Sequence, residues 1–126
     1  MSYTLEHEIV EDYIVLILKG NFDLSTLVEA AARILGVSAS SGCTRILTDV
    51  RQADMDVSMM DINTLIGKSF ELTHGHGVSL YSLRHALLSA ESQYLTRFYE
   101  SIANEHGLST KTFHDPAEGK AWLLEE

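Results

Sequence analysis

A single α/β domain spanning residues 1–126 is the fold class that the sequence predicts, with a mixed, mostly parallel five-stranded sheet and about four helices. Short apolar runs, such as Ile14 to Leu18, are typical of strands buried on both faces. Other segments repeat apolar residues at helical spacing. The segment order is strand, strand, helix, strand, helix, strand, helix, strand, helix. Right-handed crossovers make such a sheet largely parallel with one antiparallel strand.

The first two predicted strands cover residues 3–10 and 13–19. Only Glu11-Asp12 separates them, which allows a tight antiparallel hairpin. The first strand alternates polar and apolar residues, so it is expected at the periphery of the sheet. The second strand is apolar on both faces, so it is expected inside the sheet.

The first helix is predicted near residues 24–35, where apolar residues recur at helical spacing. Thr26 and Glu29 match the S/T-x-x-E capping pattern near its start, and Gly36 is its expected end. Residues 38–42 are small and polar, and they are expected to form a loop.

The third strand is predicted over residues 45–50 and ends in charged side chains. A second helix is expected to begin at Ser58, whose hydroxyl can accept a hydrogen bond from the backbone of Asp61, and to end before Gly75. Its buried face is expected to carry Met59, Ile62, Ile66 and Phe70.

The remaining elements are a strand over residues 83–89, a helix over 92–106 and a strand over 110–113. Gly107 is the expected left-handed cap of that helix, and Asp115-Pro116 starts a final helix. The inward residues expected on these two helices are Tyr94, Leu95, Phe98, Tyr99, Ile102, Ala103, Ala121, Trp122 and Leu124.

The composition excludes several classes of function. Asp and Glu total 18 against 9 Lys and Arg, which gives a net charge of −9. Such a surface repels phosphate backbones and anionic membranes, so nucleic acid is not an expected partner. Cys43 has no second cysteine, the first residues lack the pattern of a signal peptide, and the apolar runs are far shorter than the ~20 residues of a membrane span. We expect a cytoplasmic protein without an integral membrane segment.

Several motifs follow one another in a characteristic order: the opening hairpin with Gly20, the strand Ile46-Leu47-Thr48-Asp49-Val50-Arg51, the helix Phe98-Tyr99-Glu100 running to His106-Gly107, and the ending Phe113-His114-Asp115-Pro116-Ala117-Glu118. In this order the chain resembles the STAS family of anti-sigma-factor antagonists, and more closely its SpoIIAA-like branch of small bacterial proteins. The resemblance implies a non-catalytic regulatory module with a protein partner. This branch is also similar to the CRAL-TRIO lipid-transfer fold, which implies a carrier of a small apolar ligand or lipid as the alternative.

The expected working surface is the carboxyl edge of the sheet, because α/β folds place their sites there. The residues expected to bind a protein partner are Asp49, Arg51, Asp54, Asp56, Ser58, Met59 and Met60. Asp49 and Arg51 share one strand face. They either form a structural ion pair, or Arg51 binds an anion beside the second helix. The partner's identity and the oligomeric state stay open, and a homodimer is one alternative.

Phosphorylatable STAS proteins carry an Asp-Ser-Ser-Gly segment after the third strand, and the serine after the aspartate is modified. The corresponding stretch here is Met55-Asp56-Val57-Ser58-Met59, so Val57 stands at the modified position and the glycine is absent. Ser58 is a displaced candidate phosphosite. Its role as a helix cap is sufficient to explain it.

The alternative carrier function needs a crevice lined by helices, and the residues expected there are Ile62, Ile66, Phe70, Phe98 and Tyr99, which would equally suit a solid core. His74 and His76 supply two imidazoles, whereas a catalytic zinc site needs three protein ligands. We therefore expect no metal and no cofactor. Because the sequence has neither a nucleophile elbow nor a glycine-rich phosphate loop, we do not expect an enzyme.

Overall fold

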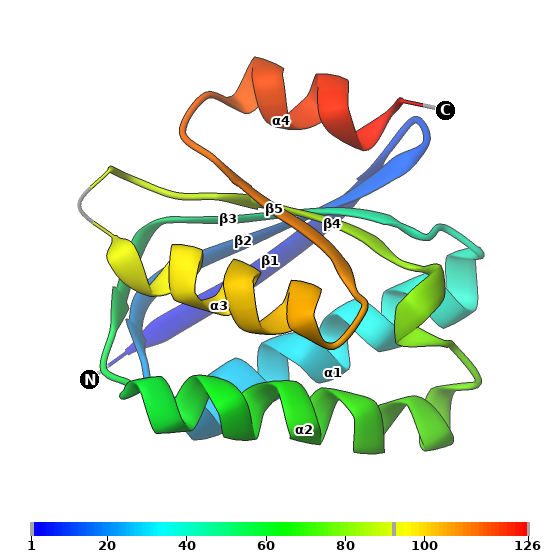
Figure 1. Ribbon diagram of the computed structural model, residues 1–126. Helices are drawn as coiled ribbons and strands as arrows, with labels where there is room; N and C mark the ends of the chain where they lie inside the picture. Colours follow the sequence, from blue (N-terminus) through cyan, green and yellow to red (C-terminus); the bar gives the residue numbers. More distant parts are fainter. Residues whose placement is uncertain (1, 92, 126) are drawn as a thin grey trace.

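The predicted strands and helices form in the predicted order (Figure 1). The protein is described by a computed structural model that covers residues 2–91 and 93–125. The elements are β1 (Tyr3–Val10), β2 (Tyr13–Phe22), α1 (Leu24–Ser41), β3 (Arg45–Met55), α2 (Met59–His76), the short 3₁₀ helix η1 (Leu80–Ser82), β4 (Arg84–Leu88), α3 (Tyr94–Glu105), β5 (Ser109–Phe113) and α4 (Pro116–Leu123).

The strands form one sheet in the order β1-β2-β3-β4-β5. β1 pairs antiparallel with β2, and the other neighbouring strands pair in parallel. This arrangement confirms the mixed, mostly parallel sheet, the opening hairpin and the peripheral place of β1. The hairpin turn is tight enough to hold Glu11 in the left-handed region, with a φ of 51°.

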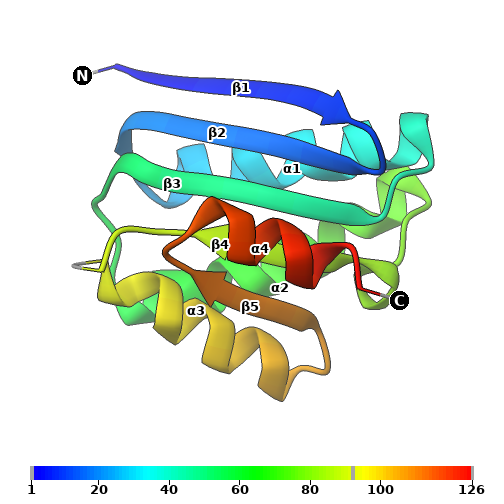
Figure 2. The same ribbon diagram turned by 90° about the horizontal axis from the view of Figure 1, so that it is seen from above.

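The helices cover the two faces of the sheet unequally. α1, α2 and α3 lie on one face, whereas α4 lies on the other (Figure 1). Viewed from the α4 side, α4 lies over β3, β4 and β5, and no helix stands in front of β1 and β2 (Figure 2). The side chains of β2 alternate between these layers, so Leu16 and Leu18 face the three helices and Tyr13 faces α4.

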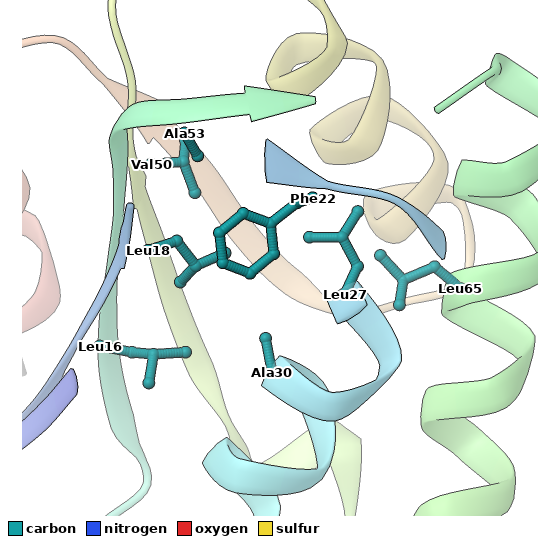
Figure 3. Close-up of a cluster of buried hydrophobic side chains, with 8 residues drawn as sticks. All are labelled: Leu16, Leu18, Phe22, Leu27, Ala30, Val50, Ala53 and Leu65. Atoms are coloured by element: carbon teal, nitrogen blue, oxygen red, sulfur yellow. The ribbon is translucent and has the colours of Figure 1, made fainter. Parts of the chain in front are cut away.

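The main hydrophobic core lies between the sheet, α1 and α2 (Figure 3). Phe22 is fully buried at its centre, with Leu18 of the same strand, Leu27 of α1 and Leu65 of α2 around it. Burying a side chain of this size stabilises the fold by about 1.5–3 kcal/mol. The core therefore ties together elements that are far apart in the sequence.

The start of α1 differs from the predicted one. The N-cap is Asp23, whose carboxylate accepts a hydrogen bond from the Thr26 backbone N–H at 2.9 Å. In return, the Thr26 hydroxyl accepts a hydrogen bond from the Asp23 N–H at 2.8 Å. Thr26 is thus the reciprocal member of the capping box, and the predicted pairing with Glu29 is wrong.

The end of α1 also differs, because the helix continues through Gly36 to Ser41. Gly42 ends it in the left-handed region with a φ of 76°. The predicted loop over residues 38–42 is thus mostly helical. Ser38 is buried there, and its hydroxyl donates a hydrogen bond to the carbonyl of Cys43 at 2.6 Å, so the polar residue is accommodated inside the fold.

Four further boundaries bear on the predictions. α2 passes through Gly75 and ends at His76, with Gly77 as its left-handed cap. β3 continues to Met55, beyond its predicted end at residue 50. The predicted start of the third helix at residue 92 lies outside the described residues. Gly107 follows α3 in the left-handed region, as predicted, with a φ of 83°.

Three side chains predicted to point inward are exposed. Met59 and Tyr94 stand in the first turns of α2 and α3, with 51% and 66% of their surface accessible. Ala121 of α4 is exposed, and Leu123 is fully buried in its place.

Candidate functional site

The carboxyl end of β3 forms an irregular edge of the sheet. Pairing with β4 stops at Asp49, which lies opposite Leu88, although β3 continues to Met55. The register with β2 shifts over the same stretch, because Ile17 faces Asp49 whereas Lys19 faces Gln52. β3 thus holds one extra residue there, which is the geometry of a β-bulge. The bulge leaves Arg51 and Gln52 both exposed.

Beyond the end of β4, the side chain of Gln93 forms hydrogen bonds with β3. Its side-chain amide donates hydrogen bonds to the carbonyls of Val50 at 2.8 Å and Ala53 at 3.0 Å. Its side-chain oxygen accepts a hydrogen bond from the Ala90 N–H at 2.7 Å. One side chain therefore joins the end of β3 to the β4-α3 connection and fixes the shape of the carboxyl edge.

Asp49 and Arg51 form a bidentate ion pair. The guanidinium donates to the two carboxylate oxygens, from Nε at 3.0 Å and from a terminal nitrogen at 2.9 Å. The Arg51 backbone N–H also donates to Asp49, at 3.1 Å. These hydrogen bonds to Asp49 raise the pKa of Arg51 above its ordinary value. Of the two roles considered for Arg51, the structure shows the ion pair.

The start of α2 presents the other predicted partner-binding residues. The Ser58 hydroxyl accepts from the Asp61 N–H at 3.1 Å, and the Asp61 carboxylate accepts from the Ser58 N–H at 3.0 Å, which confirms the predicted cap. Asp54, Asp56 and Ser58 are exposed. Met59 and Met60 follow them with exposures of 51% and 77%.

The predicted partner-binding residues lie in two groups. Asp49 shares a strand face with Leu47, which packs in the cluster with Leu123 of α4. The helix α2 begins beneath the opposite face (Figure 1). The ion pair is thus separated by the edge of the sheet from the Ser58–Met60 segment.

A groove of about 360 Å³ lies along this edge. Arg51 and Asp54 of β3 line it on one side and Gln93 and Tyr94 on the other. Tyr94 and Gln93 are site residues that the sequence analysis did not identify. Helical spacing placed Tyr94 in the core, and no local pattern around Gln93 indicates that its amide reaches β3.

A second hollow lies inside the protein, between the sheet and the helices α1, α2 and α3. It has a volume of about 90 Å³, and an adjoining cavity of about 60 Å³ shares Ala31, Ile34, Ser69, His85 and Tyr99 with it. Six of the core residues in Figure 3 line the larger cavity: Leu16, Leu18, Leu27, Ala30, Val50 and Leu65. Met55, Val57, Leu95 and Thr96 line both this cavity and the open groove.

Three polar side chains meet at the cavity. Thr48 is buried, and its hydroxyl is hydrogen-bonded to Nε2 of His85 at 2.7 Å. The Tyr99 ring approaches the His85 ring edge to face at 6.3 Å. Burial lowers the pKa of His85 to about 4 and raises the pKa of Tyr99 to about 12. Both side chains are therefore uncharged at neutral pH.

The predicted pocket residues are only partly at these cavities. Tyr99 lines both, Ile62 lines the larger and Ile66 the smaller. Phe70 packs instead against the rings of Tyr81 and His106, and Phe98 joins the cluster around Ile62 and Ala103. The sequence analysis missed Thr48 and His85 because strand residues reveal their neighbours only once the strand order is known.

The structure also shows where the histidines and the cysteine considered in the sequence analysis lie. His74 and His76 stand in the last turn of α2, and within residues 2–91 and 93–125 no three His, Cys, Asp or Glu side chains are grouped to hold a metal ion. The Cys43 thiol lies 3.2 Å from the carbonyl of Asp12. Among the helices that the structure describes, none combines the length and apolarity of a membrane span.

Solved structures share this fold over nearly the whole chain. A DUF3478-family protein with a SpoIIAA-like fold from Shewanella loihica is 19% identical with a TM-score of 0.59, and the match covers 96% of this chain and 93% of that one. An anti-sigma factor antagonist from Mycobacterium paratuberculosis is 9% identical with a TM-score of 0.65, and the match covers 98% of this chain and 96% of that one. The phosphorylated Bacillus cell fate determinant SpoIIAA is 14% identical with a TM-score of 0.50, and the match covers 97% of this chain and 99% of that one.

These likenesses establish the fold. The chain has the SpoIIAA-like fold, as the resemblance of its sequence implied. No family model matches the chain, and no curated protein matches it.

Proposed function

We propose that this SpoIIAA-like domain is a non-catalytic regulatory module that binds a protein partner through the carboxyl edge of its sheet. The docking surface comprises Asp49, Arg51, Asp54, Asp56, Ser58, Met59 and Met60, together with Tyr94. Two of the structural neighbours are described as anti-sigma factor antagonists, which supports a partner of the protein class. Ser58 is exposed on this surface, so its phosphorylation is a candidate means of regulating the docking.

The observation that carries this proposal is the exposure of Met59, Met60 and Tyr94 at the carboxyl edge of the sheet. Large apolar side chains gather here at a single edge, with accessible fractions of 51%, 77% and 66%. Methionine is flexible and polarisable and adapts to the surface of a partner, and aromatic side chains are enriched in interfaces. The carboxylates of Asp54 and Asp56 supply a polar rim.

Site-specific photocrosslinking tests the docking surface. A photoreactive amino acid at position 60 is expected to capture a defined partner in the native host, and the same amino acid at position 81 is the control. Tyr81 is also a large exposed apolar side chain, at 65% against 77% for Met60, but it lies in η1, away from the carboxyl edge (Figure 1). Met60→Asp should weaken binding of the captured partner, whereas Tyr81→Asp should not. Equal capture at the two positions contradicts the proposal.

A second candidate function, the carrier of a small apolar ligand or lipid, is supported by the internal cavity. Its lining is almost wholly apolar and it lies between the sheet and three helices. Native mass spectrometry of the protein purified from its own host tests this function. A retained small molecule supports the carrier, and a partner subunit in the same spectrum supports docking.

A further inference from the structure

The carrier function leaves the chemistry of its ligand open, and the internal cavity restricts that chemistry in three respects: polarity, charge and size. The walls come from β2, β3, β4, α1, α2 and α3, so the cavity exists only in the assembled domain. Its polar groups gather near Thr48, His85 and Tyr99.

Two of the other hydroxyls at the cavity are already engaged. Ser69 donates a hydrogen bond to the Leu65 carbonyl at 2.9 Å, and Thr96 donates to the Gln93 carbonyl at 2.8 Å. For His85, the part of the chain that the structure describes shows a hydrogen bond at Nε2 and none at Nδ1. The imidazole therefore retains one hydrogen-bonding position for a ligand, beside the Tyr99 ring.

The cavity carries no compensating charge. No Lys, Arg, Asp or Glu of the described ranges lines it, and His85 is neutral at neutral pH because burial depresses its pKa to about 4. A carboxylate or phosphate entering this space would lose its hydration without meeting a cation. An ionised fatty acid or a phosphorylated metabolite is therefore disfavoured.

The size of the cavity restricts the ligand further. A lined apolar cavity of about 150 Å³ holds one benzene molecule. The two adjoining cavities here measure about 90 and 60 Å³, which together is the scale of a single aromatic ring and too small for a long acyl chain.

We propose that the cavity between the sheet and helices α1 to α3 binds a compact, electrically neutral molecule with one hydrogen-bonding group, of the size of phenol. The apolar body of the ligand occupies the space between Leu16, Leu65 and Ala31. Its polar group meets the imidazole of His85. This inference rests on the carrier function and specifies its ligand class, and it is independent of partner docking.

Titrations with phenol, indole, toluene and octanoate at neutral pH test the ligand class, with binding followed by calorimetry and by NMR shifts of cavity methyl groups. Phenol is expected to bind with one-to-one stoichiometry and to shift the signals of Leu16 and Leu65. Indole, a fused ring, exceeds the volume of the cavities and should bind more weakly than phenol. Toluene should bind more weakly because it offers no hydrogen bond to Nδ1 of His85. Octanoate should not bind in the cavity.

Two alanines of α1 provide a matched pair of variants. Ala31→Leu fills the space shared by the two cavities and is expected to weaken phenol binding at least about tenfold. Ala39→Leu makes the same change at an exposed position of the same helix and should leave binding unchanged. If Ala31→Leu does not fold, Thr48→Val, which nearly conserves volume, serves instead. Thr48→Val removes the hydrogen-bond partner of Nε2 and so alters the hydrogen bonding of the imidazole. This variant should reduce the preference for phenol over toluene.

The outcomes separate the ligand class from the carrier function. Octanoate binding in the cavity, with phenol and indole excluded, overturns the neutral-ligand inference while the carrier function survives. Equal phenol affinity in Ala31→Leu and Ala39→Leu places the binding elsewhere and also overturns the inference. If no probe binds and the protein from its host retains no small molecule, both fail.

Discussion

At the scale of single residues, the polar side chains of this protein are placed by their partners. Thr48 and His85 come from neighbouring strands and satisfy each other inside an apolar layer at 2.7 Å. Arg51 is exposed, yet Asp49 holds its guanidinium by two hydrogen bonds. Buried polar groups are costly without a partner, so Thr48 and His85 are positions where substitution should reduce stability.

The buried imidazole predicts a dependence of stability on pH. The pKa of His85 is about 4 in the folded protein and about 6.5 when the ring is solvated. Between these values the unfolded chain binds a proton that the folded chain does not. The contribution of His85 to the free energy of unfolding is therefore greatest above pH 6.5. It should fall by about 3 kcal/mol as the pH decreases toward 4.

Urea denaturation across this pH range measures the effect. The double variant Thr48→Val, His85→Leu removes the titrating ring together with its partner, and it should lose less stability on acidification than the wild type. His74→Leu, at an exposed position of α2, is the control and should retain the wild-type slope. Identical slopes for all three proteins would show that His85 titrates normally.

The helix cap at Ser58 carries a second prediction. Ser58→Ala removes the acceptor for the Asp61 N–H and should cost about 1 kcal/mol of stability. Ser58→Asp should be tolerated, because aspartate accepts the same hydrogen bond and its charge favours a helix N-terminus. Chemical denaturation of the three proteins measures both effects. An alanine variant as stable as the wild type, combined with stoichiometric phosphate on Ser58 in cells, would favour a signalling role over the cap.

At the scale of elements, the end of β3 is held by a side chain instead of a neighbouring strand. β4 stops opposite Asp49, and Gln93 then bonds two β3 carbonyls across the gap. The bulge in β3 turns Arg51 and Gln52 toward solvent at the same place. The groove along the carboxyl edge is a consequence of this mismatch in strand length.

Gln93→Ala is therefore expected to loosen the carboxyl edge. It leaves the carbonyls of Val50 and Ala53 without their donors and should cost about 1–3 kcal/mol. Hydrogen exchange should accelerate over residues 50–55 while β1 and β2 retain their protection at Leu5–Leu18. Gln52→Ala, the control, removes an exposed glutamine from β3 and should not accelerate exchange. Unchanged exchange in the Gln93 variant would refute the bridging role.

At the scale of the whole molecule, stability comes from apolar burial on both sides of one sheet. The cluster around Phe22 joins β2, β3, α1 and α2, and the cluster around Leu123 joins α4 to the other face. Because these clusters share the strands β2 and β3, we expect the domain to unfold in one cooperative step.

Chelation tests the predicted independence from metal. The melting temperature in EDTA should equal that in buffer, because the stabilising contacts are apolar and no set of three metal-binding side chains is grouped in the described parts of the chain. Thermal denaturation with and without the chelator measures this directly. A large decrease in EDTA would show that His74, His76 or other residues hold a structural ion.

The sequence by itself determined the element order, the hairpin, the capping role of Ser58 and the mostly parallel sheet. These features depend on periodicity and on residues a few positions apart, which a linear pattern records. The ends of α1 and β3 were predicted less well. Gly36 and the small residues after it are typical of a helix end, and the bulge at Arg51 and Gln52 interrupts the alternation that identifies a strand.

Only the tertiary structure decided which side chains meet. Tyr94 has the helical spacing of a core residue, but it is 66% exposed and lines the groove at the carboxyl edge. Thr48 and His85 are 37 positions apart and become partners because β3 and β4 are neighbours in register. A local pattern specifies which face of an element is apolar. What that face contacts depends on the packing of elements that are distant in the sequence.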